Sequence, residues 1–480
     1  MWNLRKYGNH TAIIDDKGVE ASYHDLEAVQ QRMADKIKRR TLVVSLCKNS
    51  VGSVAGYVAF LNLRIAPVLL NANLDNVLMD NLLSIYQPAY IWAPSDMALK
   101  APFSGMEVVC SEYDYSLFET KYKKEYALYS ELGLLLTTSG STGSPKFVRQ
   151  SYANILSNAQ SIVSYLKLDE TERPITTLPM NYTYGLSIIN SHLLAGATLL
   201  VTDKSLMQKE FWDFFRSRKA TSFGGVPYTY EILDRLHFME MDLPYFQTMT
   251  QAGGKLTKEL HAKFAKYAAE NKKQFVVMYG QCEATARMGY LPANMAVVKC
   301  GSMGIAIPGG KFNLTDEDGI QIKEANITGE LVYEGANVTL GYAECGEDLA
   351  LGDERNGVLH TGDLAYFDDD GYYYIVGRKK RFLKIYGNRV NLDEMDRLIK
   401  GAFDGIDCAT AGVDDRLYVF ITTEKFAKDI KNYISRKTKL NPAAFEIVVI
   451  DEIPKNDAGK ILYKDLEKYY SVTVPDDADN

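Results

Sequence analysis

The sequence predicts an α/β fold: a large N-terminal body of layered α/β subdomains plus a β-rich subdomain, followed by a small mobile α+β C-terminal domain. Up to residue 279, apolar strands alternate with amphipathic helices, which is typical of layered domains with largely parallel sheets. Short strands and Gly-Asp turns follow at 301–376, and the remainder mixes short strands with helices. The 480 residues suffice for about two to four units of about 100 to 200 residues.

The N-terminal body begins with an expected hairpin at residues 11–23, where two short strands flank the turn Asp-Asp-Lys-Gly. A helix should follow, because apolar residues recur there at three- and four-residue spacing: Leu26, Val29, Met33 and Ile37. The later elements expected are strands at 42–46, 67–70, 198–202 and 275–279 and helices at 51–63, 210–218 and 258–270.

The C-terminal part has the pattern of a small α+β domain. Its expected elements are strands at 385–390, 417–423 and 446–450 and helices at 392–400 and 427–438. We place the domain boundary at the basic run 378–381, which divides the chain into domains 1–379 and 380–480.

Composition limits the possible partners and location. The net charge of −7 argues against nucleic acid as the main partner, since such proteins concentrate positive charge against phosphate. The six cysteines are scattered without a C-x-x-C pair, which disfavours a disulfide or structural metal scaffold. The N-terminus lacks the apolar core of a signal peptide, and the longest apolar stretch, 51–63, is interrupted by Asn62. We therefore expect no membrane span and a cytoplasmic location.

A loop rich in glycine and hydroxyl groups follows the apolar run 132–137. Such a loop can turn N–H and O–H groups toward a polyphosphate, while Lys146 supplies positive charge. The P-loop G-x-x-x-x-G-K-[ST] is disfavoured, because Phe147 follows the lysine and a strand-like segment precedes the next helix, expected from Ser151. A plain polar turn is the other alternative. The candidate phosphate-binding residues are Thr138, Ser139, Gly140, Ser141, Thr142, Gly143 and Lys146.

Five motifs in sequential order resemble those of the adenylate-forming superfamily, which comprises acyl-CoA synthetases, luciferases and the adenylation domains of peptide synthetases. The first is the loop at 138–146. The others are Tyr279-Gly-Gln-Cys-Glu283, Thr361-Gly-Asp363, Gly377-Arg378 with the hairpin region Lys384–Arg389, and Pro454-Lys-Asn-Asp-Ala-Gly-Lys460. Together they make the resemblance extend over nearly the whole chain.

The resemblance implies an ATP site. Attack of a carboxylate on the α-phosphate brings anions together, so the site needs cations, and Glu283 would hold Mg²⁺. Asp363 would accept hydrogen bonds from the ribose hydroxyls. The alternatives are a helix N-terminal acid at Glu283 and a turn-forming aspartate at Asp363. The other residues implied to contact the nucleotide are Gly253, Gly254, Tyr279, Gly280, Gln281, Cys282 and Arg378.

The resemblance also implies a moving C-terminal domain. Lys460 would be the catalytic lysine of the adenylation step, although the sequence alone makes it an ordinary surface lysine. The domain would rotate about a hinge at Lys380 to present a hairpin for the thiol step. Arg378 would contact nucleotide and the rest of the basic run would stay solvated; a nucleic-acid patch is disfavoured, because no aromatic residues are interleaved. The hairpin residues concerned are Lys384, Gly387 and Arg389.

The acyl pocket is implied near residues 179–186 and 223–228. Its candidate residues are Tyr182, Tyr184, Gly185 and Tyr228, although core aromatics are an equal alternative for the tyrosines. No aspartate stands nearby to pair with an α-ammonium group, which disfavours an amino acid as substrate.

The chain also departs from the family pattern at individual positions. Phe147 replaces a glycine, Asn391 stands where glutamate is common, and Cys282 replaces a phosphate-contacting threonine. A cysteine is a weak donor, so that phosphate contact is in doubt. A nucleophilic role for Cys282 lacks a histidine partner nearby in sequence.

These residues and the resemblance predict an AMP-forming acid–thiol ligase that uses ATP and Mg²⁺ to adenylate a small carboxylic acid. The acyl group would pass to coenzyme A or to the phosphopantetheine of a separate acyl carrier protein. An amino-acid-activating ligase that charges a carrier protein is one alternative. A degenerate ATP-binding scaffold with a regulatory or interaction role is another, and an ATPase or kinase is a third.

Overall fold

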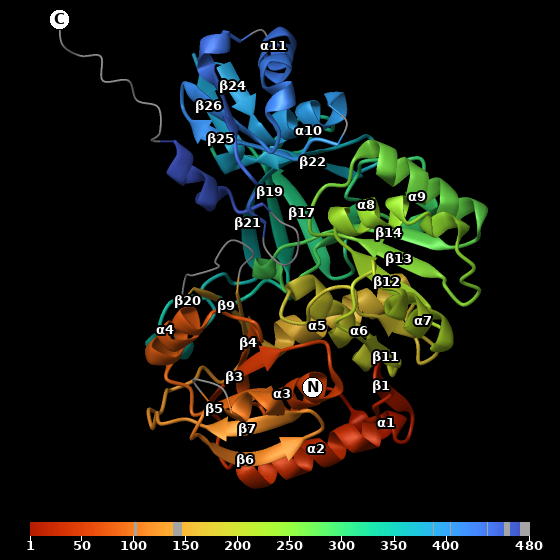
Figure 1. The fold of residues 1–480 in the computed structure, drawn as a ribbon, viewed down its shortest axis with the longest axis vertical. Coiled ribbons are helices and arrows are strands. Elements are labelled where there is room, and N and C mark those ends of the chain that lie inside the picture. Colours follow the sequence, from red (N-terminus) through yellow and green to blue (C-terminus); the bar gives the residue numbers. More distant parts are fainter. Residues whose placement is uncertain are drawn as a thin grey trace, which may run out of the picture. The chain divides into compact units, whose positions relative to one another are not determined.

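The computed structural model describes residues 1–99, 103–137, 146–386, 388–403, 405–438, 440–455 and 461–470 (Figure 1). Of residues 99, 380, 382, 384, 388 and 389 it describes the backbone only. The chain forms two compact units. The first comprises Met1–Phe312, Val332–Leu359 and Gly371–Tyr373, and the second comprises Asn313–Leu331, His360–Asp370 and Tyr374–Asn480.

One large sheet of the first unit has eight strands within the described residues. Their order is β20 (Gly341–Ala343), β9 (Phe147–Ser151), β8 (Leu132–Thr137), β4 (Ala66–Asn71), β3 (Leu42–Cys47), β5 (Tyr90–Pro94), β7 (Tyr115–Glu119) and β6 (Glu107–Glu112). The centre is parallel, since β3 pairs with β4 and β5, and β4 pairs with β8. β3 and β4 are buried along most of their length, as expected for parallel strands covered on both faces.

The second large sheet has nine strands in the described part. Their order is β16 (Ile305–Ala306), β15 (Gly289–Tyr290), β14 (Gln274–Tyr279), β13 (Thr248–Gln251), β12 (Ser222–Gly225), β10 (Pro174–Ile175), β11 (Leu199–Val201), β1 (Thr11–Asp15) and β2 (Glu20–Ser22). From β14 to β1 all neighbouring pairs are parallel. The segments that follow β12, β13 and β14 therefore leave the sheet at one edge, where open α/β sheets bind ligands.

Helices separate and cover the two sheets (Figure 1). α2 (Tyr23–Lys36), α3 (Val51–Asn62), α5 (Tyr152–Leu166) and α6 (Thr183–Ala195) share a core with strands of both sheets. α7 (Lys209–Ser217), α8 (Pro227–Arg235) and α9 (Lys258–Glu270) pack on the other face of the nine-stranded sheet, and α4 (Asn76–Tyr86) packs on the other face of the eight-stranded sheet. α1 (Leu4–Tyr7) precedes β1. The layers thus alternate between helix and sheet, which confirms the predicted α/β body.

The elements predicted for this unit are confirmed with small shifts at their ends. The N-terminal hairpin is antiparallel, and α2 begins directly after it. α5 begins after Ser151 as expected. The Ser151 hydroxyl accepts from the backbone N–H of Asn154, and the Asn154 side chain accepts from the backbone N–H of Ser151, which satisfies two free donors at the helix start.

The strands of residues 310–378 confirm the predicted β-rich texture. They form a sheet in the order β18 (Gln321–Ile322), β17 (Gly310–Thr315), β19 (Gly329–Gly335), β21 (Val358–Phe367) and β22 (Tyr373–Arg378). The boundary between the two compact units crosses four of these strands, β17, β19, β21 and β22, so each of them contributes residues to both units.

The C-terminal part of the second unit is α+β, as predicted. It contains a hairpin of β23 (Phe382–Ile385) and β24 (Asn388–Asn391), a sheet of β25 (Cys408–Val413), β26 (Arg416–Ile421) and β27 (Phe445–Val449), and the helices α10 (Leu392–Ala402) and α11 (Ala427–Thr438). One apolar core joins these elements. The single strand expected at 385–390 is wrong, because Tyr386 at φ 48° begins a turn that separates two strands.

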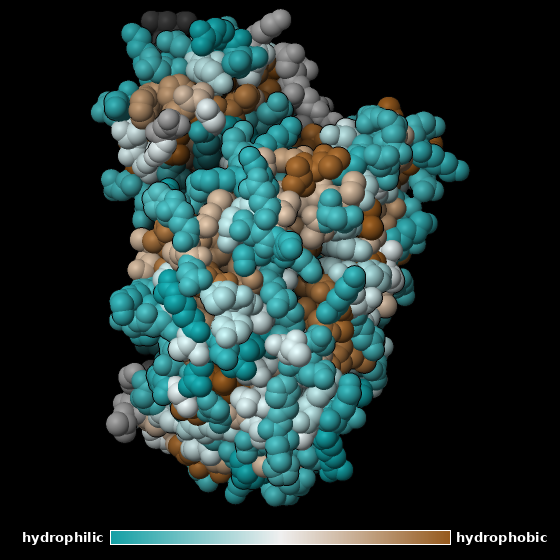
Figure 2. All heavy atoms as spheres, turned by 90° about the vertical axis from the view of Figure 1, so that its right-hand side faces the viewer, coloured by the Kyte–Doolittle hydropathy of each residue, from teal (hydrophilic) through white to brown (hydrophobic). Residues whose placement is uncertain are grey.

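Among the described residues, no helix combines the length and apolar character that crossing a bilayer requires. The face drawn in Figure 2 is mainly hydrophilic, and its apolar residues form separate small groups.

Candidate active site

The predicted phosphate loop connects two antiparallel strands. β8 and β9 pair with Thr137 opposite Phe147, so the strand expected after the loop is confirmed. Phe147 is buried and its ring lies 5.0 Å from that of Tyr86, so its side chain has a packing role. The loop candidates Thr138, Ser139, Gly140, Ser141, Thr142 and Gly143 lie outside the described residues.

Lys146 stands at the start of β9, beside β20. The two strands are antiparallel, with Tyr342 opposite Val148. Lys146 Nζ lies 3.3 Å from Glu344 Oε1 and 4.2 Å from the ring centroid of Tyr342. Both members of the ion pair are partly exposed, so the pair contributes little to stability. The ammonium group of Lys146 therefore remains partly accessible to solvent.

Glu283 lies in the short 3₁₀ helix η3 (Cys282–Ala284), after the carboxyl end of β14. Its Oε1 accepts a hydrogen bond of 2.8 Å from the Tyr342 hydroxyl. Burial, with the neighbouring Glu283 charge, raises the pKa of Tyr342 to about 12, so the hydroxyl is protonated at neutral pH and can donate. Arg355 lies with its Cζ 4.6 Å from the same ring and donates to the Glu283 carbonyl oxygen at 3.2 Å.

Tyr342 and Arg355 were not among the site residues predicted from the sequence. Tyr342 is 59 residues from Glu283 in sequence, and Arg355 is 72 residues from it. The two side chains reach Glu283 because β20 pairs with β9. No local sequence motif predicts that pairing.

Glu283 is the carboxylate that the family resemblance assigns to Mg²⁺. Within the described residues, no group of three or more His, Cys, Asp and Glu side chains could enclose a metal ion. Mg²⁺ characteristically binds one or two carboxylates, together with water and phosphate oxygens. Glu283 would hold the ion, which when bound would screen the negative charge of the phosphates.

The turn that carries Glu283 is tightly built. A Cβ on Gly280 would lie 1.5 Å from the Ala286 carbonyl oxygen, so only glycine fits there. Gln281 Nε2 donates to the Tyr279 hydroxyl at 3.3 Å. Cys282 is buried, and its Sγ lies 3.9 Å from the Thr137 carbonyl oxygen at the end of β8. The turn therefore contacts the strand that leads into the phosphate loop.

A predicted nucleotide contact, Gly253, lies close to predicted residues of the acyl pocket in the first unit. A Cβ on Gly253, at φ +82°, would approach the Tyr182 hydroxyl to 2.6 Å. The rings of Tyr182 and Tyr184 are 6.5 Å apart, and the Tyr184 hydroxyl shares a 2.7 Å hydrogen bond with Thr250 Oγ1.

The other predicted site residues of the first unit are Gly185, Gly254 and Tyr228, and each has different neighbours. Gly185 is required by packing, since a Cβ there would lie 2.4 Å from the Pro179 carbonyl oxygen. A Cβ on Gly254 would lie 3.1 Å from the Pro227 ring. Tyr228, in the first turn of α8, is 50% exposed.

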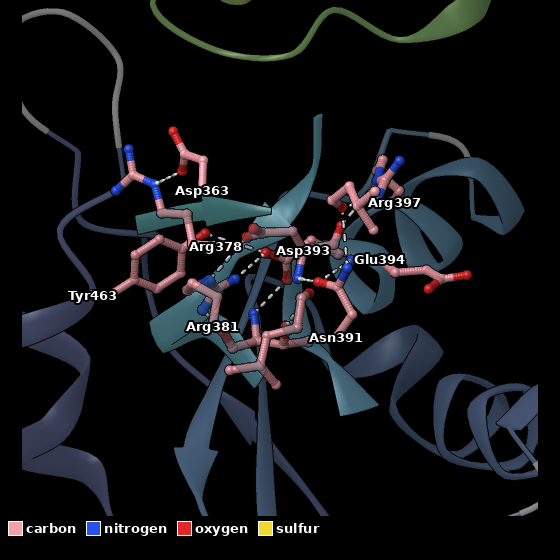
Figure 3. Close-up of polar contacts among 12 residues, drawn as sticks. Asp363, Arg378, Arg381, Asn391, Asp393, Glu394, Arg397 and Tyr463 are labelled. Atoms are coloured by element: carbon pink, nitrogen blue, oxygen red, sulfur yellow. Dashed lines mark hydrogen bonds and ion pairs between the residues drawn. The ribbon is translucent and has the colours of Figure 1, made fainter. Parts of the chain in front are cut away.

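In the second unit, the ribose candidate and a nucleotide candidate meet. Arg378 at the end of β22 lies with its Nε 3.3 Å from Oδ1 of the buried Asp363 in β21, and Figure 3 shows the two side chains facing each other. The Thr361 hydroxyl accepts from the backbone N–H of Asp363 at 3.1 Å. These contacts hold the Asp363 carboxylate in place.

The expectation that the basic run beyond Arg378 is solvated is wrong at Arg381. This side chain is buried and forms 2.8 Å ion pairs with Asp393 and Asp396 of α10 (Figure 3). Its Cζ also lies 3.8 Å from the ring centroid of Tyr463. Arg381 can be buried because two carboxylates of α10 compensate the charge of its guanidinium group.

The hairpin predicted for the thiol step is present as β23 and β24, with Lys384 directly opposite Arg389. Asn391, which departs from the family pattern, caps α10 by accepting from the backbone N–H groups of Asp393 and Glu394. Gly387, Lys460 and the side chains of Lys380, Lys384 and Arg389 lie outside the described part of the structure.

A family model described as AMP-binding enzyme matches residues 1–343. The chain belongs to this family. Among relatives of this AMP-binding enzyme, peroxisomal OPC-8:0-CoA ligase 1 from Arabidopsis thaliana is 30% identical over 72% of the chain and 65% of its own length. 4-Coumarate–CoA ligase-like 4 from Oryza sativa subsp. japonica is 28% identical over 72% of the chain and 64% of its own length. The chain thus spans less than two thirds of these two relatives.

Other similarities extend over nearly the whole AMP-binding enzyme. 2-Succinylbenzoate–CoA ligase from Geobacillus sp. (strain WCH70) is 22% identical over 95% of this chain and 94% of its own. The solved structure of O-succinylbenzoate coenzyme A synthetase (MenE) from Bacillus subtilis with AMP has a TM-score of 0.79 at 20% identity, covering 97% of this chain and 98% of that one. ATP-bound MatB from Rhodopseudomonas palustris has a TM-score of 0.75 at 21% identity, with 97% of each chain covered. These two likenesses show that the fold is shared.

Proposed function

We propose that this AMP-binding enzyme adenylates a carboxylic acid with ATP, releases pyrophosphate, and then transfers the acyl group to the thiol of coenzyme A. One observation carries the proposal: Tyr342 contacts both charged groups that the first step needs. Its hydroxyl donates to Glu283, and its ring lies beside Lys146 Nζ. A carboxylate suited to magnesium and an ammonium suited to phosphate oxygens therefore lie close together.

The choice of acceptor and the domain roles belong to the same proposal. Relatives named as CoA ligases favour coenzyme A over a carrier protein. Residues 1–379 would bind ATP and the acid. Residues 380–480 would turn about Lys380, so that Lys460 serves adenylation and the β23–β24 hairpin serves the thiol step. The proposed location is the cytoplasm.

Pyrophosphate release over a panel of fatty, aromatic, hydroxy and amino acids tests the first step. We expect an acid-dependent release that Lys460→Ala lowers about 100- to 1000-fold, because a cation that stabilises the transition state is lost. Lys464→Ala is the matched control, since this exposed lysine lies four residues further along the chain in the 3₁₀ helix η9 (Tyr463–Tyr469). Equal activity of the wild type and Lys460→Ala would refute the assigned role.

The products distinguish the other candidates. ADP or inorganic phosphate in place of AMP and pyrophosphate would indicate a kinase or an ATPase. Binding of ATP without turnover of any acid would favour a degenerate scaffold, for which the weak donor Cys282 is the motivating observation. Addition of coenzyme A or of a phosphopantetheinylated carrier protein then identifies the acceptor by the thioester formed.

A further inference from the structure

The buried arginines of the chain differ in how their charge is compensated. In the described part, the buried arginines are Arg149, Arg287 and Arg381. A buried guanidinium without a counter-charge is costly, so such groups are normally paired. Arg149 pairs with Glu354 and also donates to four backbone carbonyl oxygens, and Arg381 pairs with two aspartates.

Within the described residues, the hydrogen-bond partners of Arg287 are all neutral. Its Nε donates to Ser187 Oγ at 3.0 Å, and its Nη1 donates to the Tyr165 hydroxyl at 3.0 Å and to Met278 Sδ at 3.3 Å. Its Cζ lies 5.3 Å from the ring centroid of Tyr184. Among the described residues, no ion pair joins Arg287 to a carboxylate, and the hydrogen bonds of its guanidinium start from Nε and Nη1.

The titratable neighbours of Arg287 do not supply a negative charge. Burial raises the pKa of Tyr165 and of Tyr184, so both phenols stay neutral. Burial also lowers the pKa of His192 to about 4, so its imidazole is neutral at pH 7. The fold therefore holds one net positive charge at this point.

The backbone fixes Arg287 in this place. It follows Thr285 at φ 53° and Ala286 at φ 92°, a left-handed conformation that is unfavourable for both residues. Asn158 and Asn337 donate to the Arg287 carbonyl oxygen at 2.8 and 3.1 Å. Strained backbone conformations that are held in place by surrounding contacts are characteristic of functional sites. Arg287 also follows Glu283 by only four residues, in the same turn.

We propose that Arg287 binds the second carboxylate of a dicarboxylic acid substrate. This inference rests on the proposed function and names its substrate class. Tyr184 and Ser187 lie on the same face of α6, one turn apart, and Tyr184 is a predicted residue of the acyl pocket. The apolar cluster that contains Tyr184 and Met278 would surround the carbon chain. A carboxylate would accept from Nη2 and supply the missing counter-charge.

The first test compares each dicarboxylic acid with its own monomethyl ester in pyrophosphate release, over a series of chain lengths. The wild type should prefer the diacid in kcat/KM by about 10- to 100-fold at the best length. In Arg287→Met the ratio of the two kcat/KM values should fall to about one, and Arg287→Lys should keep part of it, because the charge remains. A wild-type preference for the ester, or an unchanged ratio in Arg287→Met, would overturn the inference.

A second test measures folding without substrate. Arg287→Met should leave the melting temperature unchanged or raise it, because it removes a buried charge whose described partners are all neutral. Arg149→Met should lower it, because it breaks a paired network. A marked fall for Arg287→Met would assign Arg287 a structural role and overturn the inference. Activation of monocarboxylic acids without preference for diacids refutes the inference alone, whereas no release with any acid refutes the proposed function.

Discussion

Arg381 offers a test of how the second unit holds its C-terminal elements together. The perturbation is Arg381→Met, which keeps the length of the side chain and removes its charge. Arg381 pairs with Asp393 and Asp396 at 2.8 Å and donates to the Thr410 carbonyl oxygen at 2.6 Å. The substitution leaves the buried Asp396 with two donors in the described part of the chain, both neutral: the backbone N–H of Thr410 and the Tyr463 hydroxyl.

The expected cost follows from this burial. Removing one partner of a buried ion pair costs about 3–5 kcal/mol of unfolding free energy, because the other charge stays buried and unpaired. Burial raises the pKa of Asp396 while Arg381 acts to lower it, so the substitution raises this pKa further. A folded-state pKa above the unfolded value means that the folded state binds more protons. The loss should therefore shrink as the pH falls and Asp396 becomes protonated.

Hydrogen exchange of the amides in β25 and β26 measures this loss where it arises. Tryptophan fluorescence would not, because Trp2, Trp92 and Trp212 all lie in the first unit. Lys209→Met is the control, since it breaks the exposed pair of Lys209 with Asp213 and should cause no measurable change. Adding Asp396→Leu to Arg381→Met should recover part of the loss, because the unpaired charge disappears. A loss below about 1 kcal/mol at pH 7 would refute the reasoning.

The other expected effects concern the first unit. Tyr342→Phe removes the hydroxyl bonded to Glu283 and keeps the ring beside Lys146, so the Mg²⁺ concentration for half-maximal pyrophosphate release should rise about 10- to 100-fold. An unchanged value would mean that Tyr342 does not position the carboxylate. His192 has a pKa of about 4 in the fold against 6.5 for the free group, so unfolding binds a proton between these values. Its contribution of about 3 kcal/mol is present above pH 6.5 and is lost as the pH falls to 4. Urea titrations at pH 7 and 4.5 should therefore show a smaller pH dependence for His192→Gln than for the wild type, and equal dependences would contradict this. Gly280→Ala should cost about 2 kcal/mol or more in thermal unfolding, because its Cβ would meet the Ala286 backbone. Gly401→Ala, with open space in α10, should be neutral or stabilising, and an equally mild effect at Gly280 would show that the turn relaxes.

The fold class was predictable because its signals are local. The three- and four-residue spacing of apolar side chains identified α2, and α9 has the predicted bounds Lys258–Glu270. The glycine and hydroxyl content of residues 138–143 predicted a phosphate loop, and the strand-like segment that begins at Phe147 is confirmed as β9. The hairpin at 382–391 was partly missed, because the left-handed Tyr386 gives no strong turn signal in sequence.

The layered α/β architecture and the order of the motifs could be predicted from the residues alone, since periodicity and loop composition act over a few neighbouring residues. Which charged side chains come into contact depends on the three-dimensional fold. The pairing of β20 with β9 brings Tyr342 to both Lys146 and Glu283. Arg381 is buried against two carboxylates, whereas Arg287 is buried with no carboxylate partner among the residues that the structure describes. Burial and long-range strand pairing set the cost of each charge, and neither quantity is contained in the residues beside it.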